Sequence, residues 1–342
     1  MKLDPNGNIL WAKQAITQGQ ATFAQSANSA MTADFKGNAY YAGNFDDTIV
    51  FGLDTLINTV RKIGLNCTNF LAKYDPDGNI KWARQSVLKG DSSLIAANAI
   101  STDTKGNCFV TGLFADTVTI GVDTLIASKT SIRYTFLVKY DSNGNIKWAK
   151  QSTGTTEYGA DGYGVENDRY GNSFITGYFA DTITFGSYTL HRQALNNQGL
   201  TFITKYDSSG NVLWAEQSTN SVPGGSIGWA ITTDIIGNAY LLGQFSDTVV
   251  FASDTLIGPN NGSIYSPQQS IFLVKYDPNG TVLWAKQTEV LDNNNWSPWA
   301  ISIDKYNHIY LEGGAPVIVK LNLEILFYNL MILPDLMLLH LY

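Results

Sequence analysis

The sequence is poor in the residues on which metal sites and disulfide frameworks depend. It has two cysteines, three histidines and four methionines among 342 residues. Cys67 and Cys108 belong to no repeated pair, so a disulfide framework is not predicted. His191, His308 and His340 stand in unrelated contexts and match neither HExxH nor another metal-ligand spacing. We therefore expect no bound metal and no cofactor.

Charged residues are also scarce. Asp, Glu, Lys and Arg make up 15% of the chain, and the formal net charge is −7, with no cluster of Lys or Arg. Nucleic acids and anionic membranes bind basic surfaces, so this composition argues against both as partners. With 44% hydrophobic residues, the chain is long enough to bury a large core and is not predicted to be disordered.

Long hydrophobic runs are missing before residue 323. Residues 1–20 lack the basic start and apolar run of a signal peptide, so we expect the chain to begin inside mature sequence. Residues 323–342 are apolar, but Glu324, Asn329, Pro334 and Asp335 interrupt them, and charges are costly at the middle of a membrane. We expect no membrane insertion and interpret residues 323–342 as an aberrant tail produced by a frameshift or truncation.

The chain does contain a long internal repeat with two hallmarks. The first is Asp-x-x-Gly-Asn followed by an apolar run that ends in glycine, at 34–43, 103–112, 168–177, 234–243 and, more weakly, 304–313. The second resembles Phe-Leu-Val-Lys-Tyr-Asp leading into Gly-Asn-x-x-Trp-Ala-x-Gln, at 70–85, 136–151, 202–217 and 272–287. A fixed period of this size indicates an array in which each unit is one supersecondary element.

The local pattern inside each unit predicts strands and tight turns. Apolar and polar residues alternate with period two, and the runs are rich in β-branched and aromatic residues. Asp-x-x-Gly-Asn suits a type I turn followed by a residue with positive φ, which glycine supplies. Each unit therefore has at least two hairpins, and the segment represented by residues 116–126 predicts a third, smaller one. No amphipathic helix is predicted before residue 323.

Repeated four-stranded units that close on a ring form a β-propeller, which protects its sheet edges by radial repetition. The predicted fold is all-β, a β-propeller of about five repeats of 66–71 residues that occupies residues 1–322 as one domain. Residues 9–14 match the last strand of a unit, and residues 317–321 match a penultimate strand. Their pairing would complete a fifth blade. The alternative is that the chain is a fragment of a longer array.

Together the hallmarks resemble the SBBP-type β-propeller repeat, which combines Asp-x-x-Gly-Asn-x-Tyr-x-x-Gly-x-Phe with Phe-x-x-Lys-Tyr-Asp-x-x-Gly-Asn-x-x-Trp. The resemblance covers residues 3–322. It implies a secreted or cell-surface bacterial protein without a conserved catalytic residue. Because the chain shows neither a signal peptide nor a sorting domain, the expected extracellular or cell-surface localisation rests on this resemblance alone.

One position varies while the frame around it repeats. Five residues before each first-hallmark Asp stands Ser29, Asn98, Tyr163, Trp229 or Trp299, followed by a small residue that suggests close backbone approach. Function usually lies in such variable segments on a rigid scaffold, and aromatic rings beside Asn, Asp and Gly suit a carbohydrate or peptide surface. The alternative is that the rings only fill the propeller axis. The ligand-binding candidates are Tyr158, Asp161, Tyr163, Trp229, Trp296 and Trp299.

Residues that recur in every unit are interpreted as scaffold. The repeated Trp at positions 11, 82, 148, 214 and 284 is predicted to pack between neighbouring units, because a ligand platform need not recur in each one. The repeated Lys at positions 73, 139, 205, 275 and 320 is expected on a solvated face. The Asp and Asn of the turns suggest calcium, but their spacing does not match an EF-hand and a hairpin turn explains them.

Catalytic patterns are weak. The chain contains no Gly-x-Ser-x-Gly elbow and no Walker loop. The non-repeated acids Asp161, Glu166, Glu289, Asp292 and Glu312 lack a spacing typical of glycosidases, so no catalytic residue is predicted. We expect a non-enzymatic extracellular scaffold or binding module whose variable loops recognise a glycan or protein partner. The alternatives are a glycoside hydrolase or lyase with acids near the propeller axis, and a purely structural surface repeat protein.

Overall fold

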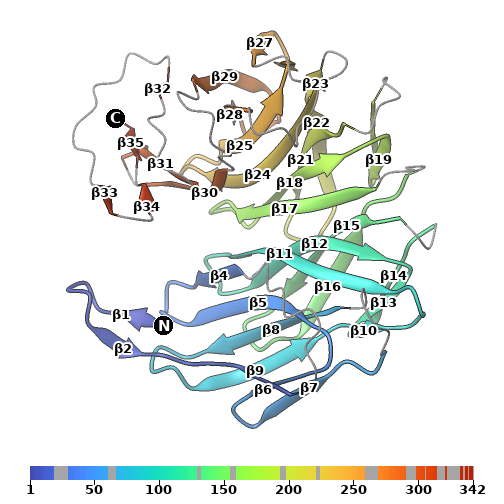
Figure 1. Ribbon diagram of the computed structural model, residues 1–342, viewed down its shortest axis with the longest axis vertical. Coiled ribbons are helices and arrows are strands. Elements are labelled where there is room, and N and C mark those ends of the chain that lie inside the picture. The colour runs from blue at the N-terminus through green and yellow to red at the C-terminus, as the bar shows by residue number, and fades with distance from the viewer. Residues whose placement is uncertain are drawn as a thin grey trace. The chain divides into compact units, whose positions relative to one another are not determined.

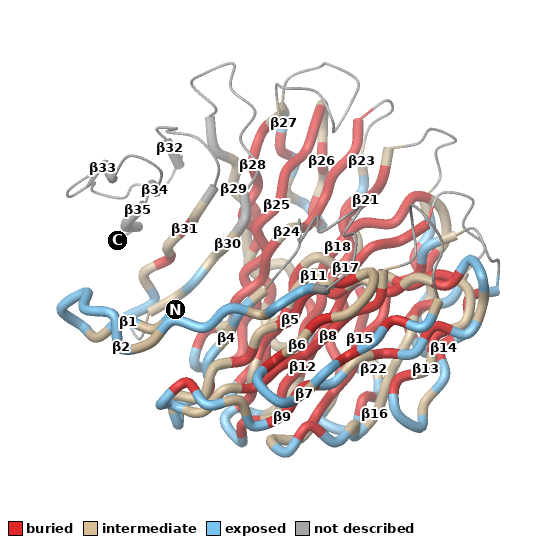
Figure 2. Tube along the Cα trace, turned by 60° about the horizontal axis from the view of Figure 1, so that its bottom comes forward, coloured by how far each residue is buried: buried red, intermediate tan, exposed pale blue. Residues whose placement is uncertain are grey.

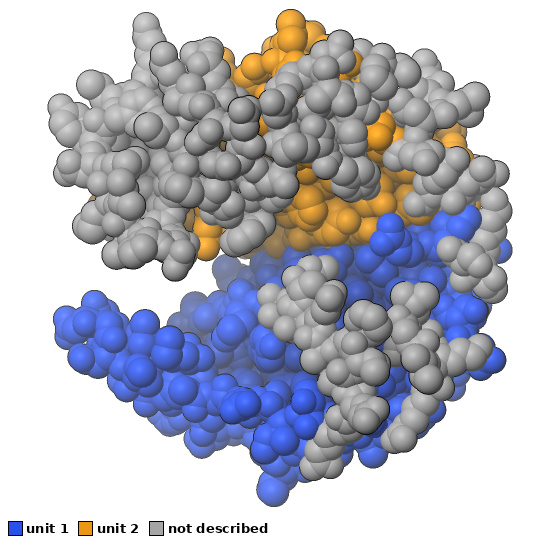
Figure 3. Space-filling model, in the orientation of Figure 1, with its two compact units in different colours: residues 1–153 blue, residues 154–342 orange. Residues whose placement is uncertain are grey.

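The computed structural model describes residues 1–18, 30–60, 67–128, 132–154, 159–192, 198–220, 224–258, 269–289, 298–304 and 306–313, and the backbone of short strands at 320–321, 332–333, 336–337 and 339–341. These residues form strands and turns without a helix, which confirms the all-β prediction (Figure 1). Within the same ranges, no helix long and apolar enough to span a membrane is found. The chain divides into two compact units, residues 1–153 and 154–342, coloured separately in Figure 3.

Unit 1 contains two complete four-stranded antiparallel sheets, each formed by one repeat in chain order. The first consists of β4 (Ala30–Ala33), β5 (Ala39–Phe45), β8 (Thr68–Tyr74) and β9 (Ile80–Gln85), and the second of β11 (Leu94–Thr102), β12 (Cys108–Ala115), β15 (Tyr134–Tyr140) and β16 (Ile146–Gln151). The predicted small hairpins are β6 (Thr48–Phe51) with β7 (Asp54–Ile57), and β13 (Thr117–Ile120) with β14 (Asp123–Ile126). Each accepts a third strand from the preceding repeat, β3 (Ile16–Gln18) or β10 (Val87–Leu88).

Unit 2 repeats this plan. Its complete sheets are β17 (Ala160–Asn167), β18 (Ser173–Phe179), β21 (Leu200–Tyr206) and β22 (Val212–Gln217), then β24 (Gly225–Thr233), β25 (Ala239–Ser246), β28 (Ser270–Tyr276) and β29 (Val282–Glu289). The small hairpins are β19 (Thr182–Phe185) with β20 (Tyr188–His191), and β26 (Thr248–Phe251) with β27 (Asp254–Ile257), the latter joined by β23 (Thr219–Asn220). The remaining strands are β30 (Pro298–Ile303), β31 (Ile309–Gly313), β33 (Ile332–Leu333), β34 (Leu336–Met337) and β35 (Leu339–Leu341).

The strands near the two chain ends pair differently from the expectation. β2 (Ile9–Trp11) pairs with β1 (Lys2–Leu3) across the turn that begins at Asp4. β32 (Lys320–Leu321) pairs with β29 instead. The predicted pairing of 9–14 with 317–321 is thus not found among the described strands, and 317–319 lie outside them. Closing a hairpin through a tight turn costs little conformational entropy because the loop is short. This favours the pairing of β2 with its neighbour β1.

The Asp-x-x-Gly-Asn turns share one hydrogen-bond pattern. At Asp103, Oδ1 accepts the backbone N–H groups of Lys105 and Asn107, each at 2.9 Å, and Oδ2 accepts the Asn107 amide at 2.7 Å. Gly106 follows the turn with φ of +79°. This confirms the predicted turn type. Because both carboxylate oxygens accept hydrogen bonds within the turn, the alternation of Asp and Asn is explained without an ion.

The core lies between neighbouring sheets of the same unit. In unit 1 one buried cluster combines Tyr40 and Leu71 of the first sheet with Val110 and Phe136 of the second. In unit 2 an equivalent cluster joins the sheet of β17–β22 to the sheet of β24–β29. The middle strands are buried on both faces, as the red segments in Figure 2 show for β15, β21 and β25. Stacked sheets therefore bury the alternating apolar positions that the sequence repeats.

Within each unit, the repeated Trp joins one repeat to a second-hallmark turn of the next repeat. In unit 2, Trp214 Nε1 donates to the carbonyl oxygen of Pro278 at 3.1 Å. A Cβ built on Gly280 would lie 2.9 Å from the Trp214 ring, so the ring packs directly on that turn. Unit 1 has the same arrangement between Trp82 and the turn at Ser142. The prediction that this Trp packs between neighbouring repeats is confirmed for Trp82 and Trp214.

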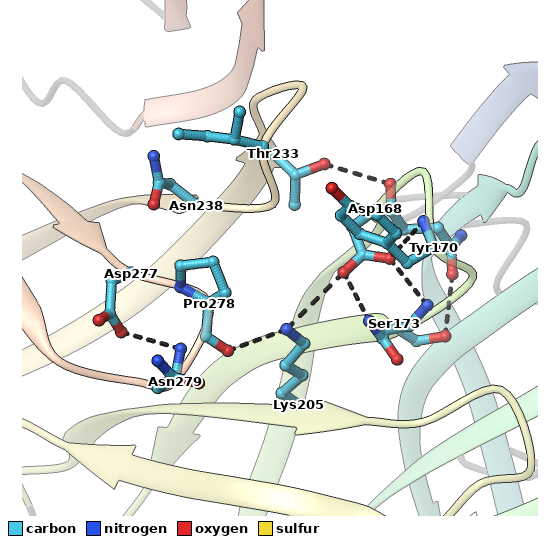
Figure 4. A network of polar contacts seen from close by, with 12 residues as sticks. Asp168, Tyr170, Ser173, Lys205, Thr233, Asn238, Asp277, Pro278 and Asn279 are labelled. Carbon is cyan, nitrogen blue, oxygen red and sulfur yellow. Dashed lines mark hydrogen bonds and ion pairs between the residues drawn. The ribbon is translucent and has the colours of Figure 1, made fainter.

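The prediction that the repeated Lys lies on a solvated face is wrong, because Lys73, Lys139 and Lys205 are buried. Lys205 is 4% exposed, and its Nζ donates to the Pro278 carbonyl at 2.9 Å (Figure 4). The same ammonium lies 3.7 Å from Oδ2 of Asp168 and 4.9 Å from the centre of the Phe174 ring. Burial lowers the pKa of Lys205, and the charge of Asp168 opposes that shift. Period-two alternation identifies the face on which Lys205 lies but not the neighbouring sheet that covers that face.

Replacing Trp214 by Ala is expected to destabilise the protein by about 3–5 kcal/mol, because a buried ring and its hydrogen bond are lost together. The free energy of unfolding from urea titration measures this change. Leu213→Ala is the matched control, since Leu213 is adjacent and 43% exposed. Equal unfolding midpoints for the two variants would show that the ring does not join the sheets.

The pKa of Asp75 is expected to lie below its usual value of 3.8. The hydrogen bond from the backbone N–H of Asn79 lowers it most, and the Asn79 side-chain amide and the Asp77 N–H lower it further. A carboxyl whose folded pKa is lowered contributes stability above its unfolded pKa and loses that contribution as pH falls through the folded pKa. NMR titration of the wild type and of Asn79→Ala measures the shift. Asn79→Ala should move the pKa of Asp75 upward, and an unchanged pKa would contradict the role of the side-chain amide.

Candidate functional site

The variable position predicted from the sequence is a β-bulge in the first strand of each complete sheet where that strand is fully described. The register shifts between Ala97 and Ala99 in β11, between Gly162 and Gly164 in β17, and between Gly228 and Ala230 in β24. The backbone of β30 has the same shift between Pro298 and Ala300. A bulge redirects its extra residue out of the regular alternation of the strand. The extra residues are Asn98, Tyr163, Trp229 and, in β30, Trp299.

The final glycine of the first hallmark stands opposite each bulge. Gly177 pairs with Gly162, and a Cβ on Gly177 would collide with the carbonyl oxygen of Asp161. A Cβ on Gly112 would likewise collide with the carbonyl oxygen of Ala96. Close backbone approach therefore excludes any side chain at this point. The repetition of this glycine was the sequence signal that could have located the bulge.

In unit 2 the bulged residues Tyr163 and Trp229 contact each other. The ring centroids of Tyr163 and Trp229 are 4.6 Å apart, and Tyr163 stacks on Tyr178 at 6.0 Å with an interplanar angle of 11°. The Tyr163 hydroxyl donates to Oδ2 of Asp161 at 3.1 Å. Asp161 and Tyr178 are buried, whereas Tyr163 and Trp229 are half-buried. The bulges thus bring three candidates together, and part of each variable ring stays accessible.

The indole of Trp229 carries a polar group suited to a ligand. Its Nε1–H is buried and has no hydrogen-bond partner among the described residues. Buried indole N–H groups usually have such a partner, and a buried donor left unpaired costs free energy. An ordered water or a ligand oxygen at this point would remove that cost.

The other candidates cannot be placed in this cluster. Tyr158 and Trp296 lie outside the described residues. Trp299 lies at the bulge of β30, but its side chain is outside the described part. Sequence reasoning missed Tyr178, which stands ten residues after a first-hallmark Asp. The residue at this position differs between repeats, being Asn44, Leu113, Tyr178 and Gln244, and this variability was the available signal.

Among the non-repeated acids, Asp161 and Glu166 lie on β17 and Glu312 lies on β31. Asp161 accepts the Tyr163 hydroxyl, and Glu166 Oε1 accepts the backbone N–H of Asn167 at 2.7 Å. Asp292 and the side chain of Glu289 lie outside the described part. Over the described ranges, no three or more His, Cys, Asp or Glu side chains are grouped so as to hold a metal ion.

No protein-family model matches the chain. Its sequence is 26% identical over 332 residues to the uncharacterized WD repeat-containing protein L264 of Acanthamoeba polyphaga mimivirus, covering 81% of this chain and 23% of that protein. The chain therefore spans about a quarter of the length of this relative. WD repeats form the blades of β-propellers. The similarity and the repeated antiparallel sheets together support a β-propeller-like repeat protein.

Two solved structures are distantly similar. A protein of unknown function from Bacteroides caccae has a TM-score of 0.37 and 12% identity, with coverage of 75% of this chain and 64% of that chain. The exotype rhamnogalacturonan lyase YesX has a TM-score of 0.20 and 9% identity, with coverage of 86% and 72%. At these TM-scores neither similarity bears on the fold or the activity.

Replacing Gly177 by Ala is expected to destabilise the protein by about 1–3 kcal/mol, because the new methyl group must displace the Asp161 carbonyl and thereby disturb the bulge. Urea unfolding measures the loss. Ser187→Ala in the exposed turn between β19 and β20 is the control. A Gly177→Ala protein as stable as the control would contradict the close approach of the two strands.

Proposed function

We propose that this chain is a non-enzymatic scaffold of the β-propeller type whose bulged residues recognise a glycan or protein partner. The observation that carries the proposal is the β-bulge, which presents a different side chain from each sheet on an otherwise repeated frame. Bulges are frequent beside binding sites because they redirect one side chain without altering the rest of the strand. The proposal includes a five-repeat SBBP-type array and an extracellular or cell-surface location.

Recognition rather than catalysis fits the chemistry of the aromatic cluster. Asp161 is buried and already accepts the Tyr163 hydroxyl, so it is poorly placed to attack or protonate a substrate. The half-buried rings of Tyr163 and Trp229 offer stacking surface, and the buried Trp229 Nε1–H has no hydrogen-bond partner among the described residues. Flat apolar surface with a few fixed polar groups is typical of sites that bind sugars or peptides.

Trp229→Ala and Tyr163→Ala are each expected to weaken ligand binding by at least about tenfold, or about 1.4 kcal/mol, because each removes stacking surface. Calorimetric titration of the full chain with a panel of neutral and acidic oligosaccharides provides the dissociation constants. Tyr188→Ala on the small hairpin is the control, since it removes an exposed ring far from the bulges in the sequence.

Variants that bind a glycan as tightly as the wild type would contradict the role of the bulged rings. Absence of binding to every oligosaccharide would refute the glycan part of the proposal. A photocrosslinking residue at position 229 then tests the protein part, and a crosslinked product that is also formed with the crosslinker at position 188 would refute that part as well.

A further inference from the structure

The turns of the two hallmarks differ in what contacts them. The second-hallmark turns at Pro76, Ser142 and Pro278 each accept hydrogen bonds from a Trp and a Lys of the preceding repeat. At the tips of the first-hallmark turns, large apolar side chains are instead between 62% and 71% exposed. Exposed apolar groups of this size, when they gather, usually mark an interaction surface. The exposed apolar residues at the tips of the first-hallmark turns are Phe35, Tyr170, Ile235, Ile236 and Tyr306.

In unit 1 a hollow of about 370 Å³ lies between two first-hallmark turns, lined by Ala33, Phe35, Thr102, Asp103 and Thr104. Thr102 Oγ1 donates to the Ala33 carbonyl at 3.1 Å, which joins the two repeats beside the hollow. The Asp103 carboxylate is buried and accepts hydrogen bonds within its own turn. The lining therefore offers a phenyl ring and methyl groups but few polar groups for a sugar, so it suits an apolar side chain.

The exposed charges at these turns are positive. Lys36 and Lys105 are exposed at the tips of the two turns that flank the hollow, and Lys36 Nζ lies 5.7 Å from the centre of the Phe35 ring. Asp34 and Asp103 are buried in the turns. Two exposed lysines therefore flank a mainly apolar hollow in a protein whose net charge is −7. This arrangement complements a partner that carries both carboxylates and an apolar side chain.

In unit 2 the same kind of turn carries a similar combination. Arg169 lies over the Tyr170 ring, with 5.5 Å between the guanidinium carbon and the ring centre. A Cβ on Gly237 would lie 3.5 Å from the Tyr170 ring, so this ring reaches the next turn, whose tip is Ile235 and Ile236. Cationic and apolar side chains thus recur at first-hallmark turns, whereas second-hallmark tips carry Pro, Ser, Asn and Asp.

We propose that the first-hallmark turns of unit 1 form a docking site for an acidic peptide segment of a partner protein. One apolar side chain of the peptide enters the hollow against Phe35, and its carboxylates bind Lys36 and Lys105. The bulged residues take no part, so this site is additional to the function proposed above. Exposed ion pairs contribute little individually and are screened by salt, so the apolar contact supplies most of the affinity and the charges supply the preference for an acidic sequence.

The test uses the full chain and a fluorescein-labelled synthetic peptide of alternating Glu and Leu, with binding followed by fluorescence anisotropy. A variant with Phe35→Ser, Lys36→Gln and Lys105→Gln is expected to raise the dissociation constant at least about tenfold, since it removes both kinds of contact. The side chains of these exposed residues are not needed for the turn hydrogen bonds, so the thermal unfolding midpoint should not change. The charge-matched control is Lys81→Gln with Lys147→Gln, two exposed lysines of β9 and β16.

Support requires that the control bind like the wild type and that added salt weaken binding. The proposal is overturned if the triple variant binds like the wild type, or if a peptide with Gln in place of Glu binds equally well. It is also overturned if the wild type binds no peptide, or if polyglutamate without Leu binds as tightly as the mixed peptide. An oligogalacturonate that binds while the mixed peptide does not would assign the site to an anionic glycan instead.

Discussion

The repeat frame within each unit depends on a backbone carbonyl in a second-hallmark turn. At Pro76, Ser142 and Pro278 this oxygen accepts two hydrogen bonds, one from a Trp indole and one from a Lys ammonium of the preceding repeat. In unit 2 the donors are Lys205 and Trp214, which face each other on neighbouring strands. Two donors from two strands determine both the position and the orientation of the next sheet. The buried ammonium is tolerated because the carbonyl, an aromatic face and a carboxylate compensate its lost hydration.

The contacts of the repeated Trp, Lys and turn separate the positions that must repeat from those that are able to vary. The Trp ring covers a turn glycine, where a side chain would collide with the ring. The carboxylate of the turn Asp accepts hydrogen bonds from backbone N–H groups of the same turn. None of these contacts uses the residue at the bulge or the two residues at the tip of the first-hallmark turn. Both places vary from repeat to repeat, and such places are where a rigid scaffold is able to carry recognition.

The aromatic cluster in unit 2 serves packing and recognition with the same atoms. Tyr163 and Trp229 pack on each other and so join neighbouring sheets, yet each remains half-buried rather than enclosed. From the sequence alone, ring packing and ligand binding are alternatives. The bulge makes them compatible, because it places a large side chain at the edge of the stacked sheets, where one part of the ring is covered and another part is not.

The sequence by itself determined the strands, the turns, the repeat period and the scaffold role of the repeated Trp. The strands and turns follow from period-two alternation and from hydrogen bonds that reach at most four residues along the chain, such as those from Asn107 to Asp103. The scaffold role of the Trp follows from its recurrence in every repeat. Only the tertiary structure decided that Lys205 is buried, that the hallmark glycine faces a bulge, and that Tyr178 joins Tyr163 and Trp229 from a third strand. Each of these depends on which strand or sheet lies opposite, and a pattern along one strand carries no information about the surface that covers it.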